Sequence, residues 1–170
     1  PTLRLGAFSL APPYRRDDWE GALSLIPPKV REEWQASAMA MEPVQEYIDF
    51  GEWAIFLTGR MHSQGISIGA GTDTPILLAI PGYSLHSELE YLVRAGLSPL
   101  EAIGSATVRP AEFVALQDEM GTIDPGKTAD LVLLDANPLQ EIANTRKISG
   151  VVTKGVYYDR EALLARLDTR

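Results

Sequence analysis

The segment "ISIGAGTDTP", residues 66–75, limits the possible folds of this chain more than any other stretch of it. Over residues 66–72 apolar side chains alternate with small ones, and this period of two is typical of a β-strand. One face of the predicted strand is apolar, whereas the other carries almost no side-chain volume before Asp73. A strand at a protein surface would place long polar side chains on that second face. We therefore expect a crowded interior against this face, with Asp73 at the end of the strand.

A helix is predicted immediately before this strand. Apolar residues recur there at steps of three and four and predict an amphipathic helix that ends at Gly65; they are Tyr47, Phe50, Ala54, Leu57 and Met61. We expect Trp53 and Phe56, which flank this stripe, to pack between the helix and a barrel. An earlier strand is predicted near residues 1–5, and two strands joined by a helix form a βαβ unit with parallel strands. Functional groups of parallel barrels lie at the C-terminal ends of strands, the position predicted for Asp73.

Local patterns predict the other elements. Residues 11–33 are rich in proline and predict a long irregular loop with at most a short helix. Trp19 and Trp34 lie at the two ends of this loop, where we expect them to pack. Three further helices are expected: one over 85–95 ended by Gly96, one from Ser98 to about Thr107 with a Ser98–Glu101 capping box, and a short one from Pro110. After them we expect a strand, turn and strand over 121–135 and a hairpin turning at Lys154 and Gly155. The last expected element is a charged helix in "DREALLARLDTR".

Composition excludes several classes of protein. With 15 Lys and Arg against 23 Asp and Glu the formal net charge is −8, so we expect no nucleic-acid partner. The absence of cysteine excludes a disulfide framework, a thiolate zinc site and a cysteine nucleophile. No run approaches the ~18 apolar residues of a membrane span, and the first residues lack the order of a signal peptide. We expect a soluble chain without a membrane partner, cytoplasmic by default, whose compartment the sequence leaves open.

One further motif formally matches the phosphate-binding loop pattern G-x-x-x-x-G-K-[ST]; its residues are Gly121, Gly126, Lys127 and Thr128. That loop requires a strand before it and a helix after it, whose N-terminus holds the phosphates. Here a strand-like segment follows the motif, and Pro125 removes a backbone N–H that the phosphate cradle would use. We therefore predict a β-turn over residues 124–126 and no nucleotide binding.

Four further segments occur along the chain and read "GAGTDTP", "PGYSLHSELEYLVRAGLSPLEAIGSATVRPAEFVAL", "GTIDPGKTADLVLLDANPL" and "VVTKGVYYDRE". In this order they resemble the C-terminal part of the amidohydrolase superfamily, closest to its imidazolonepropionase-like and Xaa-Pro dipeptidase-like branch. The similarity runs from about Pro1 to Asp159. It implies an α/β fold in which residues 1–118 form the last strands and helices of a (β/α)8 TIM barrel. Residues 119–160 would supply C-terminal strands of a composite β-sandwich, and 161–170 a terminal helix or tail.

The resemblance implies a metal-dependent hydrolase that cleaves an amide, cyclic amide or dipeptide C–N bond through a metal-activated hydroxide. In that family an aspartate at the end of the eighth strand ligates a divalent metal, zinc by first expectation and one or two ions in number, and shuttles the proton. Asp73 aligns with this aspartate. From the residues alone, an Asp before Thr-Pro is more often only a turn or helix-capping residue. Phosphoester or lactone hydrolysis at the same site, or a non-catalytic scaffold or assembly partner with this fold, are the alternatives.

The departures from the family pattern concern the other metal ligands. The family's paired histidines after the first strand, its bridging Lys or carboxylate and its later strand histidines have no counterpart here, where His62 and His86 are the only histidines. We expect His62 on a helix surface. His86 either faces the site and binds substrate or orients the loop after Asp73. Arg109 replaces the Asn that the family usually has, a change that bears on helix capping.

The expected partners follow from this incomplete set of ligands. They are a small-molecule or dipeptide-like substrate and an upstream segment of the same polypeptide, because the chain starts at Pro1 without a start signal of its own. A homo-oligomer is compatible with the sequence. Without the upstream ligands we expect residues 1–170 alone to be inactive.

Overall fold

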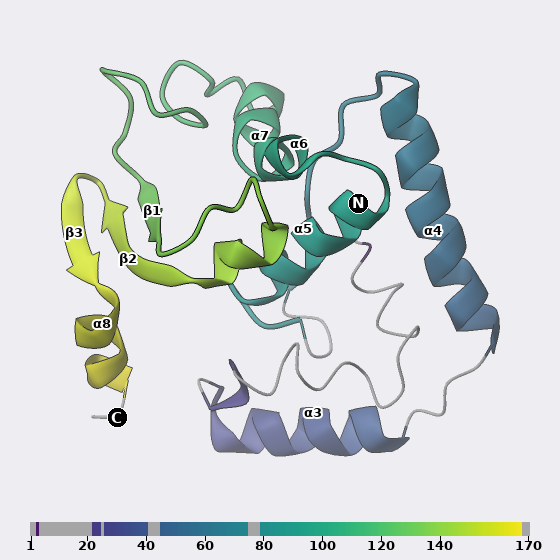
Figure 1. Cartoon of the computed structure of the whole chain (residues 1–170). Coiled ribbons are helices and arrows are strands. Elements are labelled where there is room, and N and C mark those ends of the chain that lie inside the picture. The colour runs from purple at the N-terminus through teal and green to yellow at the C-terminus, as the bar shows by residue number, and fades with distance from the viewer. Residues whose placement is uncertain (1–2, 4–21, 25, 41–44, 75–78, 168–170) are drawn as a thin grey trace. The chain divides into compact units, whose positions relative to one another are not determined.

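The computed structural model describes residues 3, 22–24, 26–40, 45–74 and 79–167 (Figure 1). The chain divides into two compact units, Pro1–Leu97 and Ser98–Arg170, and each is described by itself. None of the helices in the described ranges is long and apolar enough to cross a membrane. The predicted domain boundaries at residues 118 and 160 stay predictions.

The described part of the first unit contains three helices longer than ten residues: α3 (Pro28–Ala40), α4 (Gln45–Ser63) and α5 (Ser84–Arg94). The sequence reading of residues 11–33 as a loop with at most a short helix was wrong from Pro28 onward, because α3 is 13 residues long. Pro28 occupies the first helical position, where its missing N–H leaves no hydrogen bond unmade. Residues 11–21 of the predicted loop, including Trp19, lie outside the described residues, and Trp34 packs against a buried cluster of Ala22, Leu23, Ile26 and Ile80.

Helices α4 and α5 end in the same way, as their glycines predicted. After α4, Gly65 has φ +77° and its N–H donates to His62 O (2.8 Å), while Ile66 N–H donates to Met61 O (3.1 Å). After α5, Gly96 N–H donates to Val93 O (3.0 Å) and Leu97 N–H to Leu92 O (3.1 Å). This double hydrogen bond is the Schellman motif, which satisfies the last carbonyls of a helix and turns the chain away.

The apolar stripe of α4 is not the face that the described residues bury. Gly51, Ile55 and Thr58 are the buried residues of this helix. Trp53 and Phe56 are 54% and 65% exposed, so the packing expected for them is not formed by the described residues. Helix α4 instead approaches the end of α5 at a glycine, since Gly59 lies directly against the backbone of Ala95.

Residues 66–72 follow α4 but pair with no neighbouring strand in the described part of the chain, so the predicted strand is not formed there. Hydrogen-bonded pairing defines a strand, and the parallel neighbour expected near residues 1–5 lies outside the described residues apart from Leu3. Burial along the segment is also uneven, because Ile68 is buried whereas Ile66 is exposed. The alternation of apolar and small residues over 66–72 therefore does not produce a β-strand with two distinct faces in the described structure.

The second unit begins with two short helices, α6 (Pro99–Ser105) and α7 (Val108–Phe113). The Ser98–Glu101 capping box of α6 forms as predicted: Glu101 N–H donates to Ser98 Oγ and Ser98 N–H to Glu101 Oε2. The helix ends two residues earlier than predicted, and α7 begins two residues before Pro110. Each shift is a small error at a helix end, where sequence signals are weakest.

A three-stranded antiparallel sheet follows, in the order β1 (Leu131–Leu134), β2 (Ile148–Thr153) and β3 (Val156–Asp159) (Figure 1). The 3-10 helix η2 (Ile142–Arg146) lies between β1 and β2, and α8 (Arg160–Leu167) follows β3 as predicted. The predicted hairpin forms at Lys154 and Gly155, whose φ values of 48° and 79° are those of a two-residue type I′ turn. The strand predicted at the start of 121–135 is absent, because residues 121–123 have no strand partner in the described chain.

Candidate functional site

Asp73 lies in the segment that follows α4, directly before a turn residue, Thr74. Its backbone has φ +54°, in the left-handed region, and its side chain is exposed. Asp is one of the few residues that adopt this conformation at small cost. Its carboxylate makes no hydrogen bond or ion pair with any residue that the structure describes.

The segment after Asp73 is closed by hydrogen bonds at both of its ends. Thr74 Oγ1 donates to Ala79 O at 2.5 Å. Ile80 N–H donates to Ser84 Oγ at 2.8 Å, and Ser84 N–H donates back to Ile80 O at 3.0 Å. Ser84 is the first residue of α5 and is 1% exposed. The segment therefore begins next to the exposed carboxylate of Asp73 and ends at Ser84, the buried first residue of α5.

His86 lies in the first turn of α5 and is half-buried. Its backbone N–H donates to Tyr83 O at 3.3 Å, which ties it to the start of this helix. Its predicted contribution to substrate binding stays a prediction. His62 lies in the last turn of α4, half-buried, and lines a groove of about 470 Å³ with Arg60, Arg94 and Gly96.

The described donor atoms fit one ligand of a metal site and do not make up a whole site. No group of three His, Cys, Asp or Glu side chains that could hold a metal ion occurs among the described residues. A hydrolytic metal centre generally takes roughly three or more protein ligands and keeps a position open for water. The exposed carboxylate of Asp73 is a hard oxygen donor of the kind that divalent ions accept.

Glu88 was not singled out from the sequence, yet it is the most deeply buried acidic side chain in the described part of the chain. It is 0% exposed, and its Oε1 accepts the backbone N–H of Leu3 at 3.0 Å. A buried carboxylate is stable only where hydrogen bonds or opposite charges replace water. Glu88 follows Ser84 by one helical turn, so a search for polar residues on the buried stripe of α5, beside Leu89 and Leu92, would have found it.

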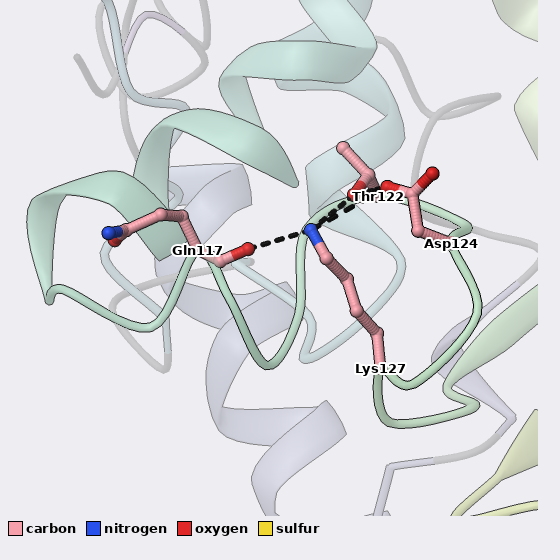
Figure 2. Close-up of polar contacts among 4 residues, drawn as sticks. All are labelled: Gln117, Thr122, Asp124 and Lys127. Carbon is pink, nitrogen blue, oxygen red and sulfur yellow. Dashed lines mark hydrogen bonds and ion pairs between the residues drawn. The ribbon is translucent and has the colours of Figure 1, made fainter.

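Lys127, the lysine of the phosphate-loop pattern, is held inside its own loop (Figure 2). Its Nζ donates to Gln117 O at 2.7 Å and to Thr122 Oγ1 at 2.5 Å, and lies 3.7 Å from Asp124 Oδ2. The backbone turns as predicted, since Lys127 N–H donates to Asp124 O and Gly126 has φ +93°. With Pro125 between them, these residues form a type II turn. The ammonium group is thus committed to a structural cluster.

Known proteins similar to this chain match its middle and C-terminal regions. The model of the Amidohydrolase family matches residues 57–157. Ochratoxinase from Aspergillus niger is 39% identical over 80 residues, which are 46% of this chain and 16% of that protein. Imidazolonepropionase from Streptococcus gordonii is 32% identical over 82 residues, or 45% of this chain and 25% of that protein. The chain therefore spans a quarter or less of the length of these two relatives.

Two solved structures resemble larger parts of the chain. A prolidase from Bifidobacterium longum has a TM-score of 0.61 at 28% identity, covering 86% of this chain and 37% of that one. An Xaa-Pro dipeptidase with bound methionine has a TM-score of 0.64 over 94% of this chain and 34% of that one, and at 24% identity it shows a likeness in fold. The family match covers more than half of the residues and includes Asp73, His86 and Lys127. This chain belongs to the amidohydrolase family.

Proposed function

We propose that this chain is the C-terminal part of a metal-dependent amidohydrolase that hydrolyses the C–N bond of an amide, a cyclic amide or a dipeptide. In this proposal the barrel strands and the other metal ligands come from an upstream segment of the same protein. The names of the relatives support the choice of bond, because imidazolonepropionase and prolidase both hydrolyse C–N bonds. The fold likeness to barrel enzymes of the family supports a (β/α)8 barrel in the complete protein.

The observation that carries the proposal is the carboxylate of Asp73. It is exposed, it has no partner among the described residues, and its backbone is held at φ +54°. An Asp before Thr-Pro can also cap a turn or a helix with its own side chain. The Asp73→Asn variant described below tests which of the two roles Asp73 has.

Asp73 would take two tasks in the reaction. One carboxylate oxygen would bind a divalent metal, which when bound supplies a Lewis acid and a water of lowered pKa. The other oxygen would accept a proton and then donate it to the nitrogen that leaves. An amine or amide nitrogen is a poor leaving group unless it is protonated, so a carboxylate that can first take and then give a proton assists both halves of the hydrolysis.

The test uses the complete protein and a panel containing an amide, a cyclic amide, an Xaa-Pro dipeptide, a lactone and a phosphoester. We expect turnover of one of the C–N substrates and a loss of at least about 100-fold in kcat for Asp73→Asn, the lower range for a general acid–base group. The matched control is Asp118→Asn, since Asp118 is also an exposed carboxylate without a partner in the described chain.

The outcomes separate the alternatives. Activity of Asp73→Asn near that of the unchanged protein would remove Asp73 from the chemistry. Turnover restricted to the lactone or the phosphoester would keep the site and change the bond. No turnover of any substrate, with no metal bound, would favour a scaffold that retains the family fold.

A further inference from the structure

We infer that Thr74 and Ser84 are positioning residues, which hold the carboxylate of Asp73 in the orientation that a metal requires. This inference rests on the proposed function, since it assigns to two further side chains the task of orienting the proposed ligand. Neither side chain is placed to be a ligand itself. The hydroxyl of Thr74 is committed to Ala79 O, and Ser84 is 1% exposed.

The direction of the Asp73 side chain depends on the conformation of its backbone. At φ +54° this backbone lies in the left-handed region, which Asp adopts at small cost, so other conformations stay accessible unless neighbouring residues restrain it. In the described chain, the nearest such restraint in sequence is a hydrogen bond of Thr74.

Thr74 is the next residue, and its hydrogen bond closes the chain back on itself. Because Thr74 Oγ1 donates to Ala79 O at 2.5 Å, the start of the segment is linked directly to its end. This bond restrains the position of Thr74. Through the peptide that joins the two residues, it narrows the range of directions open to the Asp73 Cα–Cβ bond.

The other end of the link is anchored in buried structure. Ala79 is 0% exposed, and Ile80 belongs to the buried cluster with Ala22, Leu23 and Ile26. Ser84 then accepts Ile80 N–H at 2.8 Å and donates its own N–H to Ile80 O at 3.0 Å. The two hydrogen bonds fasten the segment to the first turn of α5. These hydrogen bonds link the buried first turn of α5, through Ile80 and Ala79, to the hydroxyl of Thr74. Thr74 is the residue that directly follows Asp73.

The first experiment measures how the complete protein binds Co²⁺ alone, through the visible absorption of the bound ion. Thr74→Val keeps the shape of the side chain and removes the hydroxyl, whereas Thr74→Ser keeps the hydroxyl. We expect Thr74→Val to weaken Co²⁺ binding about 10-fold, the lower range for a side chain that orients a ligand, and to shift the cobalt spectrum. Thr74→Ser should restore both. The matched control is Thr107→Val, because Thr107 Oγ1 also donates to a backbone carbonyl, Ile103 O at 2.9 Å.

A second pair of variants keeps the inference testable if Thr74→Val fails to fold. Ser84→Ala removes the acceptor of Ile80 N–H and should weaken Co²⁺ binding in the same direction. Ser105→Ala is its control, since Ser105 is equally buried and its hydroxyl also makes a hydrogen bond to the backbone, donating to Ala102 O at 2.6 Å. Thermal unfolding of each variant is recorded beside the spectrum, because a purely structural role would lower the midpoint and leave the cobalt spectrum of the folded protein unchanged.

Asp73→Asn distinguishes the two ways in which the inference can fail. If Asp73→Asn changes the cobalt spectrum while Thr74→Val and Ser84→Ala match their controls, the positioning role is overturned and the proposed function stands. If Asp73→Asn binds Co²⁺ with an unchanged spectrum, Asp73 is no ligand, and the proposed function and the positioning role fall together.

Discussion

A methyl group at Gly59 has no room, because the main chain of the neighbouring helix occupies its place. A Cβ built on Gly59 would lie 2.1 Å from Ala95 O, an atom of the backbone that cannot move by itself. We expect Gly59→Ala to force α4 and α5 apart and to lower the free energy of unfolding of the complete protein by about 1–3 kcal/mol. Urea denaturation measures this change.

The control for Gly59 is a glycine in a helix with open space around it. A Cβ at Gly104, within α6, would meet nothing within 4 Å. Gly104→Ala should leave the stability unchanged or raise it by up to about 1 kcal/mol, since alanine favours the helix. Equal effects of the two substitutions would contradict a close crossing of α4 and α5 at Gly59.

Lys127 should matter for the stability of its loop and be irrelevant to nucleotides. Its side chain is 18% exposed, and its ammonium group donates to Gln117 O and Thr122 Oγ1. Lys127→Met keeps the apolar stem and should lower the free energy of unfolding by about 1–3 kcal/mol, the range for a lost charged hydrogen bond. Lys29→Met, at an exposed position of α3, is the control and should be near neutral.

ATP or GTP with magnesium should produce no shift in the melting temperature of either the unchanged protein or Lys127→Met. A saturable shift that Lys127→Met abolishes would show that the phosphate-loop pattern functions after all. The contacts in Figure 2 argue against this, because a ligand would first have to displace Lys127 from Gln117 and Thr122.

Among the elements, the β2–β3 hairpin has the most demanding turn. Gly155 has φ +79° and a Cβ there would meet nothing within 4 Å, so the penalty of a side chain is conformational and not steric. Gly155→Ala should cost about 1–2 kcal/mol of stability. Lys154→Asn should raise stability by roughly 0.5 kcal/mol, because asparagine is favoured at the first position of this turn. Chemical denaturation of both variants checks the opposite signs, and a loss of stability in Lys154→Asn would argue against the type I′ turn.

The elements that were predicted correctly carry their signals within a few residues of chain. The Ser98–Glu101 capping box, the glycine at the end of α5 and the Lys154–Gly155 turn each act through local hydrogen bonds or dihedral angles. The strand over 66–72 needed a partner distant in sequence, and the pattern alone could not supply it. For α3 the error had another origin, since the prolines were taken to allow at most a short helix, whereas Pro28 occupies the first position of a helix of 13 residues.

The candidate site, like the elements, could be predicted only in part from the sequence. Asp73 could be selected from its place at the end of an apolar, small-residue segment, and the family resemblance gave it a role that stays a proposal. The helical period places Glu88 and Ser84 on the buried stripe of α5, but their contacts with Leu3 and Ile80 come from the fold and could not be read from that period. Which face of α4 is buried also depends on its neighbour, and the apolar stripe indicated the opposite face.

At the scale of the whole molecule, α4 leaves large apolar side chains exposed in residues 1–170: Tyr47, Phe50, Trp53 and Phe56 are each more than half exposed. Exposed apolar surface of this size usually marks an interface or promotes aggregation. Produced alone, the 170 residues should bind a hydrophobic dye such as ANS and self-associate in light scattering. They should neither hydrolyse the substrate panel nor retain a divalent metal through dialysis.

This prediction separates the piece from the complete protein. Metal content, hydrolase activity, near-UV circular dichroism and light scattering are measured on both. A monomeric, cooperatively folding and metal-loaded hydrolase made of residues 1–170 alone would show that the upstream segment is not needed.

The hydrogen bond between Leu3 N–H and Glu88 Oε1 has a consequence for the order of synthesis. Its two partners are 85 residues apart, so the ribosome makes the Leu3 amide long before its acceptor. At ~5–20 residues per second, this delay is on the order of 4–17 s. The β2–β3 hairpin, in contrast, can close within about 10 μs once its strands are available. A growing chain therefore holds the Leu3 amide without its buried acceptor for seconds, whereas the hairpin has both of its strands almost as soon as they are made.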